Sequence, residues 1–88
     1  MAERKLKIKN KLGMHARPAS LIVQTVSKHK SEVELWKDNT VANGRSIMSV
    51  MLLAAENGAE LTVKATGEDE EQVVDAIAKL VDDGFGEE

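Results

Sequence analysis

The sequence contains no cysteine, and its 88 residues include only two aromatic side chains and one proline. Without cysteine, disulfide scaffolds, thiolate metal sites and cysteine nucleophiles are all excluded. Because Trp36 and Phe85 are the only aromatic residues, the core must be built mainly from Val, Ile, Leu and Ala. The absence of cysteine is also compatible with a reducing compartment.

A long hydrophobic run and a basic face are absent too. The longest apolar stretch, residues 50–55, is far too short to span a bilayer, and the first residues do not resemble a signal peptide. We therefore expect a cytoplasmic protein without membrane insertion. The net charge is −3, and acidic residues gather toward the C-terminal part of the chain. Nucleic acid is not expected as a partner, since phosphate contacts need a basic surface.

Hydrophobic periodicity predicts a single domain over residues 1–88, with the element order β-α-β-β-α-β-α. Alternation of apolar and polar residues indicates strands at 5–9, 32–37, 40–42 and 60–65. Apolar residues at helical spacing indicate helices at 16–28, at 46–54, and between Asp69 and Gly84. Each strand is apolar on one side only, so the sheet should be antiparallel or mixed, with helices on one face. The fold class is therefore α+β, an open-faced β-sandwich.

Finer expectations concern the helix ends and buried stripes. Ser46 is a plausible N-cap of the second helix, and Asp69 of the third, with Gln72 at the capping-box position. The stripes expected to face the core are Ala19, Ile22, Val23 and Val26 in the first helix, Val50, Leu53 and Ala54 in the second, and Val73, Ile77, Leu80 and Val81 in the third.

The segment around His15 combines several features of an anion site. Gly13 permits a tight turn, and Pro18 fits the first turn of a helix, which puts His15 at or just before the helix start. The free N–H groups near Ala16 and Arg17, with the positive end of the helix dipole, can hold an anion. The same dipole favours a neutral, nucleophilic imidazole. The Arg17 guanidinium can bind phosphate oxygens in a bidentate way.

A histidine at a helix start is nevertheless more often a cap or a surface residue than a nucleophile. His29, in a Lys-rich loop, is interpreted as an ordinary surface residue. The two histidines are far apart in the sequence and no third ligand is indicated, so neither a metal nor another cofactor is expected. Spacing alone therefore leaves His15 as a candidate.

Three segments resemble one known family. Residues 12–19, Leu-Gly-Met-His-Ala-Arg-Pro-Ala, are similar to the active-site signature of HPr, the histidine-containing phosphocarriers of the bacterial sugar phosphotransferase system. Residues 45–51, Arg-Ser-Ile-Met-Ser-Val-Met, resemble the regulatory-serine region of that family, and residues 58–63 with 66–67 resemble its last strand. The resemblance covers essentially the whole chain. It implies a four-stranded antiparallel sheet with three helices on one face, and a phosphocarrier rather than an enzyme.

The resemblance also implies roles for individual residues. His15 would accept a phosphoryl group on Nδ1 from phosphorylated enzyme I and donate it to IIA domains of sugar permeases. Arg17 would neutralise the phosphate, which would be held at Ala16, Arg17 and Pro18. Ser46 would be a regulatory phosphosite for HPr kinase/phosphorylase, with a regulatory protein as a further partner. A donor that visits several partners is expected to be a monomer.

The second helix is apolar nearly all round, because Ile47, Met48 and Met51 lie opposite its core stripe. Such a helix is often simply buried. A sheet with one helical layer, however, has nothing to cover that side, which favours an exposed docking patch. The family resemblance also implies that this patch, together with Ser20, contacts partners.

Other functions remain open. Leu52, Ala54 and Asn57 depart from the commonest sugar-system pattern, and residues 10–14 and 83–85 resemble the nitrogen-related paralogue NPr. A regulatory binding module switched by phosphorylation of Ser46 is a second alternative. A stand-alone hydrolase or metal enzyme is not favoured, since paired carboxylates and clustered histidines are missing from the sequence.

Overall fold

The chain follows the predicted order of strands and helices. The computed structural model describes residues 1–87. Its elements are β1 (Ala2–Lys7), α1 (Ala16–Ser27), β2 (Glu32–Lys37), β3 (Thr40–Asn43), α2 (Ile47–Leu52), β4 (Glu60–Thr66), α3 (Glu70–Asp82) and a 3₁₀ helix, η1 (Gly84–Gly86). The α+β open-faced sandwich is therefore confirmed, with η1 as an addition.

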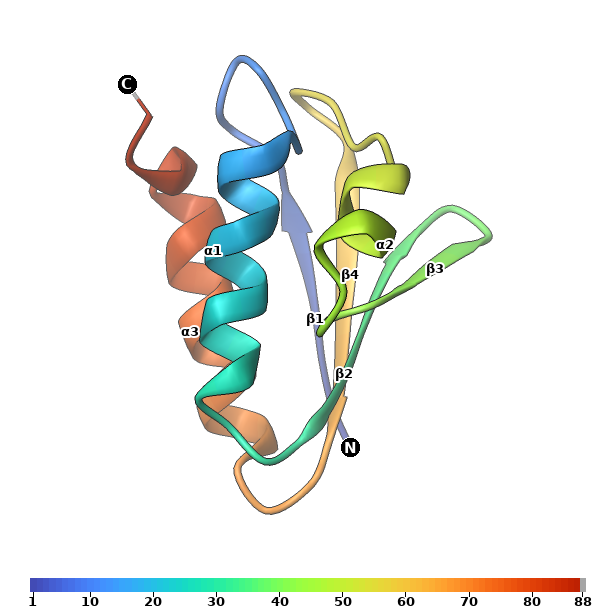
Figure 1. Cartoon of the computed structure of the whole chain (residues 1–88), viewed down its shortest axis with the longest axis vertical. Coiled ribbons are helices and arrows are strands. Elements are labelled where there is room, and N and C mark those ends of the chain that lie inside the picture. Colours follow the sequence, from blue (N-terminus) through green and yellow to red (C-terminus); the bar gives the residue numbers. More distant parts are fainter. Residues whose placement is uncertain (88) are drawn as a thin grey trace.

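The four strands form one sheet in the order β1-β4-β2-β3, and every neighbouring pair is antiparallel. The three α-helices lie in front of this sheet in Figure 1 and cover one face of it. On the central strand β4, Leu61, Val63 and Ala65 have no exposed surface, because alternate residues of a strand point to the same face. On the opposite face the ammonium group of Lys64 lies 4.7 Å from the centroid of the Trp36 ring.

Helices α1 and α3 bury the expected faces with small differences. Ile22 and Val26 of α1 are fully buried, whereas Val23 is half-buried. In α3 the half-buried residue is Leu80, and Val74 and Ala78 join the buried stripe. Within residues 1–87, no helix has the length and the apolar character needed to cross a membrane.

The predicted second helix is too long. Helix α2 ends at Leu52, and Leu53 follows as its C-cap. Ala54 then adopts φ of +52° and is exposed, while Ala55 is buried. Ala54 was expected to face the core, and this was wrong, because the helix ends two residues earlier, at Leu52, and Ala55 is turned inward instead. Val50 and Leu53 are buried as predicted.

The capping box expected at α3 is also wrong. Asp69 is the N-cap residue, but its carboxylate makes no capping hydrogen bond within the helix. It accepts hydrogen bonds from the N–H groups of Lys30 and Ser31 and from the Ser31 hydroxyl, so it ties the α1–β2 loop to α3. These bonds lower the pKa of Asp69 to about 2. Glu70, rather than Gln72, reaches back and accepts from the Gly67 N–H at 3.0 Å.

The chain beyond α3 folds back rather than simply ending the helix. The sequence predicts Gly84 as the helix stop, but α3 ends at Asp82 and Gly84 opens η1 with φ of +62°. Phe85 follows with φ of +57°, and the residue is 2% exposed. Burial of this ring holds η1 against the body of the domain, and the segment after α3 lies at the same end of the molecule as the start of α1 (Figure 1).

Candidate functional site

His15 is the N-cap residue of α1, with extended backbone angles. Its carbonyl oxygen accepts the first helical hydrogen bond, from the Ala19 N–H at 3.0 Å. Pro18 is buried and has no N–H to offer. The first turn therefore leaves two backbone donors, the N–H groups of Ala16 and Arg17, and neither has an acceptor within residues 1–87. Such donors at a helix N-terminus favour an anion.

The loop before His15 is held by close backbone contacts. Asn10 is fully buried, and its amide donates to the Gly13 carbonyl at 2.8 Å. Gly13 has φ of +70°, and a Cβ at this position would lie 2.5 Å from the Ala55 carbonyl oxygen. The Met14 N–H donates to that same oxygen at 2.7 Å. The loop carrying His15 is therefore attached to the segment that follows α2, which places α2 beside the histidine.

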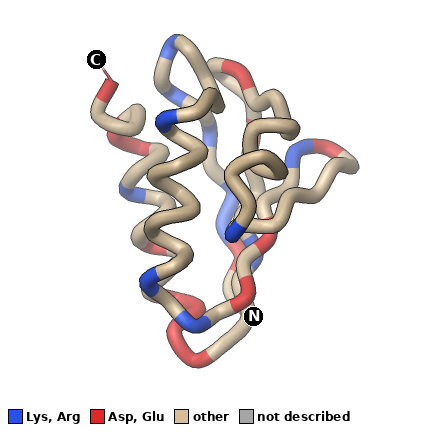
Figure 2. Tube along the Cα trace, viewed as in Figure 1, with Lys and Arg blue, Asp and Glu red and all other residues tan. Residues whose placement is uncertain are grey.

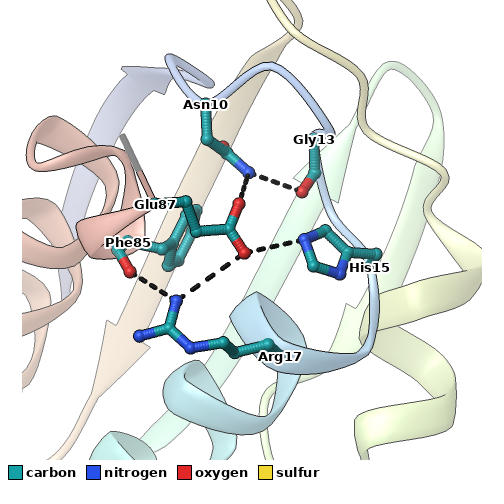
Figure 3. A network of polar contacts seen from close by, with 6 residues as sticks. All are labelled: Asn10, Gly13, His15, Arg17, Phe85 and Glu87. Carbon is teal, nitrogen blue, oxygen red and sulfur yellow. Dashed lines mark hydrogen bonds and ion pairs between the residues drawn. The ribbon is translucent and has the colours of Figure 1, made fainter.

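The two ring nitrogens of His15 have different surroundings. Nε2 is buried and lies 2.8 Å from Oε2 of Glu87, a close contact without regular hydrogen-bond geometry that is an ion pair only when the ring is protonated (Figure 3). Nδ1 has no hydrogen-bond partner within residues 1–87. Unlike Nε2, it is not a buried atom without a partner. Nδ1 is consequently the accessible nitrogen of a side chain that is 36% exposed.

Arg17 points toward the C-terminal segment. Its guanidinium donates to the Phe85 carbonyl at 2.7 Å and lies 3.6 Å from Oε2 of Glu87. The other carboxylate oxygen of Glu87 accepts from the Asn10 amide at 2.9 Å. The pKa of Glu87 lies below its ordinary value, first because of the Asn10 hydrogen bond and then because of the positive charges of His15 and Arg17, while partial burial opposes this shift. Glu87 is therefore ionised at neutral pH.

The other predicted site residues lie on α1 and α2. Ser46 is the N-cap of α2, and its hydroxyl accepts from the Ser49 N–H at 3.2 Å. Ile47, Met48 and Met51 are exposed by 41%, 67% and 36%. Leu52 of α2 and Leu12 of the loop before His15, which sequence reasoning did not include, are exposed by 72% and 74%. Ser20 is half-buried on α1 and accepts a hydrogen bond from Gln24.

Charged residues are missing from α2. Figure 2 shows an uncharged α2, a basic residue at the start of the neighbouring α1, and acidic residues around α3 on the other side of α1. Because α1 packs against α2, the exposed apolar residues of α2 lie next to the helix that begins at His15. We call the set of Leu12, Ile47, Met48, Met51 and Leu52 the apolar patch.

Sequence reasoning missed Asn10, Phe85 and Glu87 as parts of this site. Asn10 and Glu87 are 77 positions apart, and Arg17 and Phe85 are 68 apart, so no local periodicity connects them. One signal was present in the sequence Gly84-Phe85-Gly86. A single phenylalanine between two glycines, after an amphipathic helix, is typical of a turn that buries a ring.

Comparison with known proteins agrees with this geometry. Residues 2–83 match the family model described as the PTS HPr component phosphorylation site. The chain is 42% identical over 88 residues to the phosphocarrier protein HPr of Xylella fastidiosa, covering 100% of this chain and 99% of that protein. It is 38% identical over 86 residues to the phosphocarrier protein NPr of Proteus mirabilis, covering 97% and 96%.

Solved structures of HPr are similar throughout. HPr-C-His from Thermoanaerobacter tengcongensis superposes with a TM-score of 0.95 at 45% identity, covering 100% of this chain and 99% of that one. An HPr dimer from the same organism superposes with a TM-score of 0.78, covering 99% and 100%. Family model, sequence relatives and fold thus agree over nearly the full length: the chain belongs to the HPr family and is a phosphocarrier of the phosphotransferase system, not an enzyme.

Proposed function

We propose that His15 accepts a phosphoryl group on Nδ1 from phosphorylated enzyme I and donates it to IIA domains of sugar permeases. The observation that carries this proposal is the difference between the two ring nitrogens. Nε2 is buried against Glu87, whereas Nδ1 is accessible and free of partners among residues 1–87. A phosphoryl group can therefore reach one nitrogen only, beside the two donors of the first turn of α1.

The phosphate is held by main-chain and side-chain donors in this proposal. The N–H groups of Ala16 and Arg17 bind its oxygens, helped by the helix dipole. Pro18 contributes by shaping the first turn of the helix, because its φ suits this position and it has no N–H that would need an acceptor. The Arg17 side chain is 55% exposed, so it can leave the Phe85 carbonyl and place its guanidinium on the phosphate. A bidentate, charge-assisted contact of this kind is stronger than the bond to a neutral carbonyl.

The apolar patch and Ser20 form the docking surface in this proposal. The patch is uncharged and next to α1, and flexible methionine side chains can adapt to several partner surfaces. Ser46 stands at its edge, as the N-cap of α2. Phosphorylation of Ser46 by HPr kinase/phosphorylase would leave the helix start intact, since a phosphate is favourable there. It would also repel an acidic partner surface and so lower transfer.

The test is a transfer assay with a matched pair of variants. The full chain is incubated with phosphoenolpyruvate and enzyme I, and acid-labile phosphate is measured by ³¹P NMR. His15→Ala should accept no phosphate, and His29→Ala should accept as much as the unchanged protein, because within residues 1–87 the His29 ring bonds only the Thr25 carbonyl. If His15→Ala still became labelled, the proposal would be wrong.

The same assay separates the two relays. Sugar-type and nitrogen-type enzyme I are offered in parallel, with IIA domains of both kinds as acceptors. Faster transfer with the sugar-type components supports the proposal, and a preference for the nitrogen-type components assigns the chain to an NPr-like relay in place of the sugar relay.

A second candidate is a regulatory module whose output is contact with a regulatory protein. It is favoured by the position of Ser46 at the edge of the apolar patch, where a phosphate changes the surface without changing the fold. Phosphorylation of Ser46 together with absence of transfer from His15 to IIA domains would support it. We further propose a cytoplasmic monomer, and sedimentation distinguishes this from the dimer seen for the Thermoanaerobacter tengcongensis protein.

A further inference from the structure

Glu87 contacts the phosphoryl-transfer site from the far end of the chain. Oε2 lies 2.8 Å from Nε2 of His15 and 3.6 Å from the guanidinium of Arg17, while Oε1 accepts from Asn10 at 2.9 Å. The Glu87 side chain is 18% exposed, half as much as that of His15. Figure 3 shows the carboxylate between the three side chains, on the Nε2 edge of the imidazole ring.

The position of this carboxylate is determined by several elements. Asn10 is itself fixed, because it is fully buried and also bonds the Gly13 carbonyl. Phe85 anchors η1 in the core, and its carbonyl oxygen is bonded by Arg17. A surface ion pair between two mobile side chains would contribute little. Here the acceptor is held by a buried amide and a buried ring, so its position 2.8 Å from Nε2 does not depend on the contact with His15 alone.

The geometry points to Glu87 as a positioning residue for His15: its carboxylate keeps the ring proton on Nε2 and leaves the lone pair on Nδ1 for the phosphoryl group. This inference rests on the proposed phosphoryl transfer at His15. A neutral imidazole carries one proton, on either nitrogen. An ionised carboxylate only accepts hydrogen bonds, so an unprotonated Nε2 would place two acceptor atoms 2.8 Å apart.

The transfer step then requires no proton movement at His15. The Nδ1 lone pair forms the new N–P bond, the P–N bond of the donor histidine breaks, and its electron pair returns to the donor ring. The Nε2 proton stays where it is. Positive charge develops on the ring of His15 as the bond forms, and the carboxylate of Glu87 faces that charge from the edge opposite to the phosphate. An aspartate beside a catalytic histidine acts on its tautomer in the same way.

The test measures the tautomer directly, in the full chain and without phosphate. Ring ¹⁵N chemical shifts of His15 are recorded at a pH where the imidazole is neutral, for the unchanged protein, Glu87→Ala and Glu87→Gln. Asp83→Asn is the matched control, because it removes one carboxylate next to η1 that makes no contact with His15. Backbone amide spectra verify that all four proteins share one fold.

We expect the unchanged protein and Asp83→Asn to show a protonated Nε2 and an unprotonated Nδ1. In Glu87→Ala and Glu87→Gln both nitrogens should shift toward values averaged over two tautomers. The rate of phosphate transfer to His15 should fall about tenfold in these two variants, as is usual when the partner that orients a histidine is removed, and should be unchanged in Asp83→Asn.

An unprotonated Nε2 or a tautomer mixture in the unchanged protein overturns the inference, and so does an unchanged tautomer or transfer rate after loss of the carboxylate. The tautomer is read without enzyme I, so it separates this inference from the proposed function. Failure of the unchanged protein to take up phosphate would contradict the proposed function, whatever the tautomer.

Discussion

Gly13 stands two residues before His15. Any side chain at this position would strain the backbone and clash with the main chain of residues 55–56. Its φ is +70°, and a Cβ would lie 2.5 Å from the Ala55 carbonyl oxygen and 2.9 Å from the Glu56 Cα. Both neighbours are main-chain atoms, which cannot rotate away. Gly13→Ala should therefore separate the loop from residues 55–56 and weaken the bond from the Met14 N–H to Ala55.

Gly58 offers a matched control for the strain alone. Its φ is +89°, and a Cβ there would meet nothing within 4 Å. Placing alanine in this backbone region costs about 1 kcal/mol, and this is the whole loss expected for Gly58→Ala. For Gly13→Ala, the clash and the weakened hydrogen bond add about 2 kcal/mol. The free energy of unfolding should thus fall by about 3 kcal/mol in Gly13→Ala and by about 1 kcal/mol in Gly58→Ala.

Thermal unfolding followed by circular dichroism measures the difference. For a domain of this size, 1 kcal/mol corresponds to about 4–8 °C in Tm, so Gly13→Ala should melt about 12–24 °C lower and Gly58→Ala about 4–8 °C lower. Phosphate uptake by His15 should slow only in Gly13→Ala, because only this loop positions the histidine. Equal losses in the two variants would refute the reasoning that the contact with Ala55 requires glycine.

Three further predictions concern the rest of the molecule. Met48→Ala, at a side chain 67% exposed, should change the free energy of unfolding by less than about 0.5 kcal/mol but raise the KM for enzyme I in the transfer assay. Ser46→Ala should cost about 1 kcal/mol in urea unfolding, because Ser49 loses its N-cap acceptor, whereas Ser46→Asp should keep the cap and lower transfer. The pKa of Asp69 is lowered from 3.8 to about 2, so the stability that its ionised carboxylate contributes is complete above pH 3.8 and is lost as the pH falls toward 2. In Asp69→Asn the midpoint of urea unfolding should therefore depend less on pH over this acidic range.

Much of the fold could be predicted because its cause is local. The alternation at Leu61, Val63 and Ala65 reflects the two faces of a strand, and all three side chains are buried. The apolar spacing of α1 likewise indicates which side meets the sheet. Strands that are apolar on one side only predict a sheet that is antiparallel or mixed, and the structure shows that every pair is antiparallel.

Errors occurred where a local pattern competes with a tertiary contact. Asp69 has the sequence of an N-cap, yet its carboxylate bonds the loop at Lys30 and Ser31, which packing brings within reach. Ala54 fits a helical stripe, yet the chain turns there with φ of +52°. The Asp69 contacts could not be read from neighbours in the sequence, because Lys30 and Ser31 are 39 and 38 positions away. The turn at Ala54 is followed by Ala55, which is buried and accepts from the distant Met14 N–H.

The sequence by itself determined the features of the site that depend on a helix start. Pro18 and the apolar spacing place the first turn, and His15 with the N–H groups of Ala16 and Arg17 follows from that, because these residues are consecutive. Tertiary structure alone decided which ring nitrogen is open. Burial of Phe85 brings Glu87 across to Nε2 of His15, and only a packed core can hold together residues so distant along the chain.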